Sequence, residues 1–364
     1  MSLLVFGAGA IGRGYLPWVF PPDQYEYRYV EADPMMRTRL SESGRFTTFK
    51  TVNGEYEALE VPVAECLAPG ESASALSKVD AVITAVGPRN VRSLGNTLRG
   101  LSLPVVCCEN DSAVPRRLAA ATGNARVVLG IPDVIASNTA PDRLLAVDPL
   151  GLVTEDGECF VDQAVSDLGG NCHYVDEEEL DNQWRAKLYI HNTPHCIAAY
   201  LGSVRGVSYL HEAMDHPRIH AVVQGVMDEM ARMLELRYRM NQGFVRWYSG
   251  KELRRFSNTL LYDPVARVAR EPFRKLAHND RLIGAAELCL SCGVVPENVI
   301  LGIMAAFWYE ASDDPDINIR YLRAALEPSE FLRMIIRLRP GEALYEIVLD
   351  RWDQNVATLS ELRS

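Results

Sequence analysis

The chain has 364 residues, of which 48% are hydrophobic and 23% charged, and this composition is that of a globular protein rather than a disordered one. That length is enough for two domains with ordinary cores. The formal net charge of −11 argues against a general binder of nucleic acids or anionic membranes, because phosphate contacts need clustered cations.

The N-terminus and the cysteines indicate a cytoplasmic protein. Residues 1–6 run directly into glycines and lack the charged region and long apolar stretch of a signal peptide. The longest strongly apolar run, 299–308, is too short to span a membrane. The eight cysteines are scattered, so free thiols are expected, and the single CxxC of Cys289 and Cys292 is interpreted as two small core residues.

The first half of the chain alternates short apolar runs with segments of helical length. Runs typical of buried strands lie at 3–6, 27–30, 81–86, 105–108 and 127–129, and a further strand is expected over 152–161. Strands separated by helix-length segments predict βαβ units and a parallel sheet. We therefore expect an α/β fold with an N-terminal parallel-sheet domain over residues 1–184. Pro17 should shorten or kink its first helix.

From residue 185 onward the pattern becomes helical. The apolar residues of 218–240 fall on one helical face, 287–309 and 328–338 are also predicted to be helical, and 311–316 is predicted to be a loop. We therefore expect residues 185–364 to form a mainly α-helical substrate-binding and catalytic domain.

Gly7, Gly9 and Gly12 form a GxGxxG motif that directly follows the first predicted strand and opens a helical segment. Gly7 permits the tight turn, Gly9 lets the backbone approach a pyrophosphate, and Gly12 lets the helix pack on the strand. Ala10 and Ile11 lie in the first helical turn, where free N–H groups face the phosphates. The context predicts a Rossmann-type dinucleotide site.

The second predicted strand ends at Glu31, about 20 residues after the last glycine of the motif. A carboxylate there accepts hydrogen bonds from the adenosine ribose and repels a 2′-phosphate. Asp33 adds to the negative field, and the nearest following cation is Arg37. NAD is therefore the expected cofactor rather than NADP.

Two later strand ends are expected to face the same crevice. One contains Val86 and Gly87, and the other contains Asn110. Without the glycine motif, ordinary turn chemistry would be the better interpretation of both.

Lys187, Asn192 and His195 form a Lys-x4-Asn-x2-His array. Pro194 suits the first turn of a helix, with Thr193 or Asn192 as its cap. Asn192 and His195 would then lie near a positive helix end, where a developing alkoxide is stabilised. The spacing alone does not bring Lys187 to the other two, and each residue taken singly also has a structural interpretation.

Together these motifs resemble the polyol-specific long-chain dehydrogenases, the mannitol dehydrogenase family. The resemblance covers most of the chain: residues 6–14, 84–88 and 108–110, the Lys187 to His195 array, and the block 255–276. Residues 6–14 are most similar to the members that act on mannitol phosphate. The resemblance implies an NAD-dependent oxidoreductase that interconverts a polyol or polyol phosphate and the corresponding ketose without a metal.

The resemblance also implies residue roles. Lys187 matches the family's general base, which needs a pKa lowered by burial or by nearby cations. Asn192 is the implied donor to the substrate oxygen, with Asn110 as a second donor, and His195 is implied to bind and orient the substrate. His191 has no counterpart in the family signature and is interpreted as structural.

Other basic positions match the family's contacts to the polyol or its terminal anionic group, namely Arg267 and Lys275. The chain departs from the family at Ser137 and Asn138, where members carry an Asp-Arg pair. Two further hypotheses therefore stay open: a keto-uronate reductase of the same family, and an NAD-binding regulator without turnover. The expected partner is a small molecule, with no nucleic acid and no membrane, and the expected assembly is a monomer or homodimer.

Overall fold

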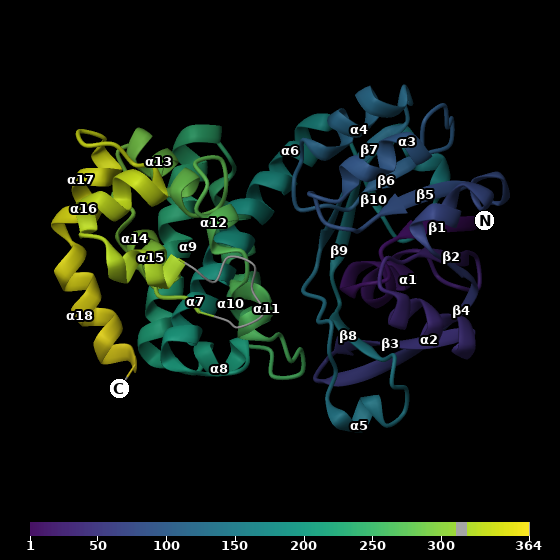
Figure 1. Cartoon of the computed structure of the whole chain (residues 1–364), viewed down its shortest axis with the longest axis horizontal. Coiled ribbons are helices and arrows are strands. Elements are labelled where there is room, and N and C mark those ends of the chain that lie inside the picture. Colours follow the sequence, from purple (N-terminus) through teal and green to yellow (C-terminus); the bar gives the residue numbers. More distant parts are fainter. Residues whose placement is uncertain (311–318, 364) are drawn as a thin grey trace. The chain divides into compact units, whose positions relative to one another are not determined.

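A computed structural model describes residues 1–310 and 319–363, so the loop expected over 311–316 lies outside the described residues. The chain divides into two compact units (Figure 1). The sheet unit comprises Met1–Trp184 with Leu260–Tyr262, and the helical unit comprises Arg185–Thr259 with Asp263–Ser364. The expected α/β fold, with a Rossmann-like sheet followed by helices, is confirmed.

Within the described part of the chain, the strands form one 10-stranded sheet in the order β10-β9-β7-β6-β5-β1-β2-β4-β3-β8. In chain order the strands are β1 (Ser2–Phe6), β2 (Glu26–Val30), β3 (Arg45–Val52), β4 (Glu55–Leu67), β5 (Ala81–Thr84), β6 (Val105–Cys107), β7 (Val127–Asp133), β8 (Leu152–Glu155), β9 (Glu158–Asp162) and β10 (His173–Val175). The central strands pair in parallel, with β1 between β2 and β5. The chain crosses over on either side of β1, and ligands bind at such switch points.

Helices cover both faces of this sheet, as the near-continuous apolar strands require. Leu3 and Val5 of β1 pack in one core cluster with residues of α1 and α2, while Leu4 and Phe6 pack in another with residues of α3 and α4. The helices of this unit are η1 (Ala10–Tyr15), α1 (Leu16–Val19), α2 (Pro34–Ser43), η2 (Pro69–Ser74), η3 (Leu76–Lys78), η4 (Val91–Ser93), α3 (Leu94–Thr97), α4 (Val114–Thr122), α5 (Asp142–Leu145), η5 (Gln163–Leu168) and α6 (Glu177–Ala186).

Two features of the sheet differ from the sequence expectation. The single strand expected over 152–161 is wrong, because a turn at 156–157 separates β8 from the antiparallel partner of β7, β9. The long hairpin β3–β4 was not expected, because its alternating polar residues lack an apolar run. Asn53 and Gly54 connect it with φ values of +51° and +84°, and Asn-Gly is the strongest short hairpin signal.

The helical unit consists of η6 (Lys187–Asn192), α7 (Thr193–Arg205), α8 (Leu210–Met214), α9 (Pro217–Tyr238), α10 (Gln242–Phe256), α11 (Val265–Ala269), α12 (Pro272–Lys275), α13 (Ile283–Ser291), α14 (Glu297–Ala306), α15 (Ile319–Ala325), α16 (Pro328–Phe331), η7 (Leu332–Ile336), α17 (Ala343–Asp350) and α18 (Trp352–Arg363). Most residues of α7 and α14 are buried. The helix predicted over 218–240 corresponds to α9. The single helix predicted over 287–309 is wrong, because Gly293, with φ +75°, and Pro296 interrupt it between α13 and α14.

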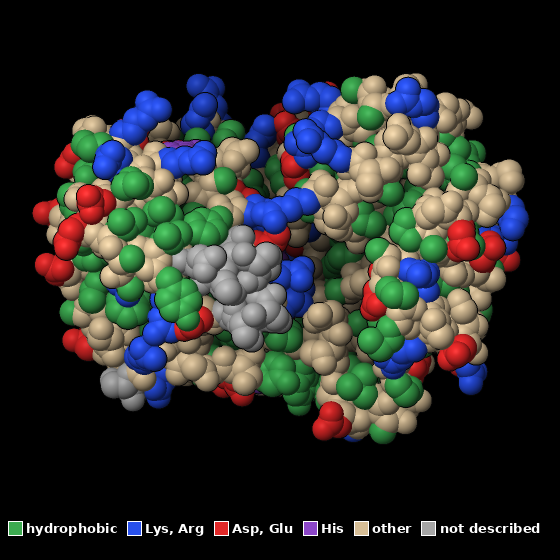
Figure 2. Space-filling view, in the orientation of Figure 1, with side chains coloured by type: hydrophobic (Ala, Val, Ile, Leu, Met, Phe, Trp, Pro, Cys, Tyr) green, Lys and Arg blue, Asp and Glu red, His purple; other side chains and the backbone are tan. Residues whose placement is uncertain are grey.

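The surface carries both signs of charge. Lysine and arginine side chains alternate with acidic ones over each unit on the face in Figure 2. The cysteines of the CxxC are both free thiols, and of the two predicted core residues Cys289 is buried whereas Cys292 is only partly buried. Among the described residues, no helix has the length and apolar character needed to cross a lipid bilayer.

Candidate active site

The glycine motif forms a tight turn between β1 and η1. Gly7 has a φ of +96°, a conformation that residues with side chains rarely adopt. A Cβ at Gly7 would overlap the carbonyl oxygen of Ala85, and one at Gly12 would overlap that of Gly7. A Cβ at Gly9 would meet no described atom within 4 Å, so the backbone of Gly9 faces open space. This turn therefore fits a pyrophosphate that lies against Gly9.

The first helical turn after the glycines supplies donors. Ala10 and Ile11 are partly exposed, and N–H groups in a first turn lack an intrahelical acceptor. The helix begins as a π turn, because the N–H of Leu16 donates to the carbonyl of Ile11, five residues back. The next residue, Pro17, has no N–H to continue an ordinary ladder, and the helix ends at Val19. The sequence expectation of a shortened helix therefore has its physical cause in Pro17.

Two charged side chains of opposite sign hold the turn at Ala8. The N–H of Ala8 donates to Oε2 of Glu31 at 2.8 Å, and the carbonyl oxygen of Ala8 accepts from Nε of Arg13 at 2.6 Å. Arg13 is buried, and its Nη1 donates to the carbonyl of Leu150 at 2.7 Å. Sequence reasoning missed Arg13, although its place in the first helix beside the glycines was a signal. A buried cation next to this turn favours a bound anion.

The expected ribose-binding residue, Glu31, stands at the end of β2. Its Oε1 accepts from the N–H of Asp33 at 2.9 Å, so each carboxylate oxygen already accepts one backbone bond and keeps a further lone pair. The guanidinium of Arg37, the nearest following cation, donates to the carbonyls of Glu31 and Ala32. Both bonds come from Nη1, so they hold the guanidinium against the backbone at the end of β2.

A buried carboxylate organises the strand end that was expected to bind the cofactor. Glu109 accepts the N–H groups of both Val86 and Gly87, at 3.0 and 2.8 Å, and burial raises its pKa. Those two N–H groups are therefore engaged within the protein. Val86 and Gly87 can pack against a cofactor, but they cannot donate these N–H groups to it. The sequence reasoning quoted Glu109 but missed this role. Asn110, the next residue, is exposed.

The catalytic array lies on a helical segment that runs from α6 through η6 into α7. The expectation that a helix begins at Asn192 or Thr193 is wrong, because Ala186, Asn192 and Thr193 all have helical backbone angles. Asn192 and His195 therefore do not lie at the positive end of a helix. The physical reason is that Pro194 is accommodated by a π turn, in which the N–H of Thr193 donates to the carbonyl of Leu188.

This π turn has a consequence for the array. Residues five apart on an α-helix point roughly 140° away from each other, whereas a π turn bonds such residues to one another along the axis. The turn therefore brings Lys187 and Asn192 closer to one side of the helix. Both residues are buried. Among the described residues, Nδ2 of Asn192 has no hydrogen-bond partner, and a buried donor of this kind calls for an acceptor.

His195 belongs to a chain of polar contacts. Its Nε2 lies 2.8 Å from Oδ2 of Asp263, while Nε of Arg267 donates to Oδ1 of Asp263 at 2.9 Å. Burial lowers the pKa of His195 to about 4, although Asp263 opposes this shift, so the ring is neutral near pH 7. Burial alone would raise the pKa of Asp263, but Arg267 and the bond from His195 lower it to about 2.

A second chain of the same kind lies beside the first. Nδ1 of His191 is 2.5 Å from Oε2 of Glu252, and Arg255 donates to the other oxygen of that carboxylate. The rings of His191 and His195 have their centroids 5.0 Å apart, and both contact Phe256. These bonds agree with the structural interpretation of His191, while the buried carboxylate of Glu252 was missed.

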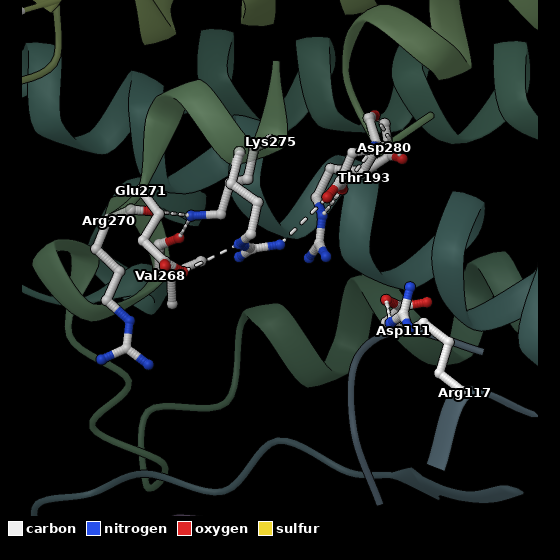
Figure 3. A network of polar contacts seen from close by, with 10 residues as sticks. Asp111, Arg117, Thr193, Val268, Arg270, Glu271, Lys275 and Asp280 are labelled. Atoms are coloured by element: carbon white, nitrogen blue, oxygen red, sulfur yellow. Dashed lines mark hydrogen bonds and ion pairs between the residues drawn. The ribbon is translucent and has the colours of Figure 1, made fainter. Parts of the chain in front are cut away.

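The two predicted basic contacts differ in their surroundings. Arg267 keeps 23% of its side chain exposed, with its guanidinium paired to Asp263. Lys275 is buried, and its ammonium donates to the carbonyls of Val268 and Arg270, as Figure 3 shows. Burial lowers the pKa of Lys275 to about 7. The bonds of Lys275 hold the backbone around Arg267 rather than pointing to an open site.

Beside Lys275, a network of ion pairs leads toward the helix that carries the predicted catalytic array (Figure 3). Arg274 pairs with Glu271 and with Asp280, and Asp280 pairs with Arg281. The carbonyl of Arg281 accepts the hydroxyl of Thr193 at 2.9 Å. This network joins the substrate-domain block to the start of α7.

Ser137, one of the two residues that depart from the family pattern, has a structural role in the sheet unit. Ser137 is buried, and its hydroxyl donates to the carbonyl oxygen of Tyr262 at 3.0 Å. Tyr262 has a φ of +48°, a strained value for a residue with a large side chain. Ser137 therefore helps to hold a strained turn, while Asn138 is exposed.

Comparisons with known proteins find relatives of this chain by sequence and solved structures that share its fold. The family model described as the mannitol dehydrogenase C-terminal domain matches residues 179–320. Mannitol-1-phosphate 5-dehydrogenase of Thermoanaerobacter pseudethanolicus is 30% identical, over 85% of this chain and 86% of that protein. The enzyme of the same name from Bacillus licheniformis is 29% identical, over 96% of this chain and 99% of that protein.

The solved structures agree on the fold. Mannitol 2-dehydrogenase of Pseudomonas fluorescens, in a ternary complex with NAD and D-mannitol, has a TM-score of 0.78 at 15% identity and covers 100% of this chain and 94% of its own. A D-sorbitol dehydrogenase has a TM-score of 0.64 at 14% identity, covering 99% of this chain and 91% of its own. The motif resemblance is thereby confirmed: the chain belongs to the mannitol dehydrogenase family.

Proposed function

We propose that this protein is an NAD-dependent dehydrogenase that interconverts a polyol phosphate of the mannitol 1-phosphate type and the corresponding ketose phosphate. The observation that carries the proposal is the buried amide nitrogen of Asn192, which has no hydrogen-bond partner among the described residues and stands on the same π turn as the buried Lys187. A donor without such a partner, on the same turn as a buried amine, suits a substrate hydroxyl that is losing its proton. The names of the relatives over nearly the whole chain support the substrate class.

In the oxidative direction, Nζ of Lys187 takes the hydroxyl proton as general base, without a metal. An N–H of the Asn192 amide donates to the oxygen as negative charge develops on it. NAD, when bound, accepts the hydride that leaves the carbinol carbon, so the alcohol becomes a ketone and the proton stays on the lysine. His195 orients a neighbouring part of the substrate.

The cofactor site is proposed for the glycine turn of the sheet unit. Gly9 leaves open space for the pyrophosphate, and the N–H groups of Ala10 and Ile11 face it. Glu31 keeps lone pairs for the ribose hydroxyls, and its negative charge would repel a 2′-phosphate. Nη1 of Arg37, on the neighbouring helix α2, is engaged by backbone carbonyls.

The anionic end of the substrate is proposed to meet the block around Arg267. Its side chain is partly exposed, and Arg270, three residues on, is exposed as well. Lys275 supports this block indirectly, because its ammonium donates to two of the block's backbone carbonyls. Guanidinium groups suit phosphate oxygens through paired N–H donors.

The test is a coupled assay of NAD reduction with polyols, polyol phosphates and sugar acids. Mannitol 1-phosphate is expected to be among the best substrates, and EDTA is expected to leave the rate unchanged. Lys187→Ala should lower kcat by at least about 10³-fold while NAD binding is retained. A preference for keto-uronates would instead indicate a sugar-acid reductase, and tight NAD binding without turnover on the whole panel would indicate a regulator.

A further inference from the structure

We propose that Asp263 is a positioning residue that fixes the tautomer of His195, so that His195 presents a lone pair, and not an N–H, to the substrate. The proposal rests on the proposed function for the nature of the substrate. With a lone pair on Nδ1, His195 binds a substrate hydroxyl at that atom and rejects a phosphate or carboxylate oxygen.

The contact geometry fixes which nitrogen carries the proton. Oδ2 of Asp263 lies 2.8 Å from Nε2 of His195, and Asp263 is 3% exposed. An ionised carboxylate only accepts hydrogen bonds, so Nε2 must be the N–H donor. A neutral imidazole has one N–H, and burial keeps this ring neutral. Nδ1 is therefore left with a lone pair.

Neighbouring rings also fix the orientation of the His195 ring. The imidazole of His195 stacks on Phe256 with centroids 5.1 Å apart and an angle of 22° between the planes. His191, one helical turn earlier, lies at 5.0 Å on another side. Asp263 and this packing together prevent a ring flip that would exchange the nitrogen for a carbon.

The lone pair on Nδ1 of His195 determines which kind of substrate group can bind there. Asn192 and His195 are three residues apart on one helix, and such residues are neighbours on its surface. Asn192 donates to the reacting oxygen, whose proton goes to Lys187, whereas the lone pair of His195 can accept from a neighbouring hydroxyl of the substrate, which has its own proton to give. A phosphate or carboxylate oxygen has no proton to give and would be repelled by the lone pair. His195 therefore binds a neutral hydroxyl next to the reacting carbon, and the anionic end lies elsewhere.

Arg267 allows the tautomer of His195 to be tested with a variant of Asp263. Its Nε donates to Oδ1 of Asp263, leaving Oδ2 for His195. In Asp263→Asn, Arg267 can only donate and therefore selects the single amide oxygen. The amide NH₂ then faces Nε2 of His195, which must accept, and the proton moves to Nδ1. Arg267 would thus enforce the inverted tautomer in this variant.

The experiment is ¹⁵N NMR of the full-length protein labelled at histidine, with the His195 signals assigned by their loss in His195→Gln. The wild type is expected to show a protonated Nε2 and an unprotonated Nδ1. Asp263→Asn should invert the pair and lower kcat/KM by about 10²- to 10⁴-fold, with NAD affinity unchanged. Glu252→Gln, the matched change at the neighbouring histidine, should leave the His195 signals unaltered.

A wild-type His195 protonated at Nδ1 would overturn the proposal, whether or not any variant folds. A folded Asp263→Asn that keeps the wild-type tautomer would overturn it too. The proposed function fails separately: absence of turnover on every polyol and polyol phosphate would refute that function, while the tautomer would still be read directly from the spectrum.

Discussion

The backbone N–H of Ala8 donates to the carboxylate of Glu31, so the side chain expected to read the ribose also holds the glycine turn. Glu31→Ala removes both functions. We expect the Kd for NAD to rise by about 10-fold or more, because one charge-assisted bond to the turn and the ribose contacts are lost. The preference for NAD over NADP should fall at the same time, as measured by titration with each cofactor.

Asp33 provides the matched control for that change. Its side chain accepts from the N–H of Met35 and caps helix α2. Asp33→Ala should therefore lower the free energy of unfolding by about 1 kcal/mol and leave the cofactor preference near the wild-type value. A loss of preference in Asp33→Ala but not in Glu31→Ala would contradict the assignment of Glu31.

Gly9 and Gly12 should respond in opposite ways to alanine. A methyl group at Gly9 meets no described atom, so Gly9→Ala should unfold at nearly the wild-type temperature but bind NAD at least about 10-fold more weakly. A methyl group at Gly12 overlaps the carbonyl of Gly7, so Gly12→Ala should be destabilised even without cofactor. Thermal unfolding with and without NAD separates the two effects. Equal NAD affinity in Gly9→Ala and the wild type would refute the pyrophosphate site.

Asn192→Leu should make the protein more stable and less active. The amide nitrogen is buried without a described partner, so an apolar side chain of similar size removes a desolvation penalty of about 1–3 kcal/mol. The same change removes the proposed donor to the alkoxide, and kcat should fall by about 10²- to 10³-fold. Urea unfolding and steady-state kinetics give the two numbers. A variant that keeps full activity would exclude Asn192 from the site.

Acid should destabilise the helical unit through His195. The pKa of its ring is lowered from 6.5 to about 4, so between these values the unfolded chain takes up a proton that the folded protein does not. The free energy of unfolding therefore falls as the pH drops from 6.5 to 4, by up to roughly 3 kcal/mol from this group. The lowered pKa of Asp263 adds a further loss below pH 4, down to about pH 2.

Urea unfolding between pH 7 and pH 4.5 measures this slope. His195→Gln should flatten it relative to the wild type, because glutamine does not titrate. An identical slope in the two proteins would show that another group carries the acid sensitivity.

The sequence predicted those features that depend on short, local patterns. The strand–glycine–helix context located the dinucleotide turn, because Gly7 and Gly12 fill positions where any Cβ would overlap the backbone. The long helix α9 was predicted from an eight-member apolar face, of which seven members are buried and Val222 is partly exposed. In both cases the residues that form the predictive pattern lie within a few positions of one another, although the contact that excludes a Cβ at Gly7 is with the distant Ala85.

The parts that sequence reasoning missed depend on contacts between distant residues. Glu252 is bonded to His191 across 61 positions, and Asp263 to His195 across 68. Nothing in the local pattern of either carboxylate marks it as buried, and charged residues are usually exposed. The start of the catalytic helix was misplaced for a different reason: Pro194 is a signal for a first turn, and only packing decides that the helix continues through it.

Both proposed functional helices carry a π turn that ends at the residue before a proline, at Leu16 before Pro17 and at Thr193 before Pro194. A π turn is equivalent to one surplus residue in a helix, and it shifts the phase of every side chain downstream by about 100°. In each helix the turn is followed by a proline, which has no N–H with which to continue the ordinary ladder, so each phase shift is fixed at its proline.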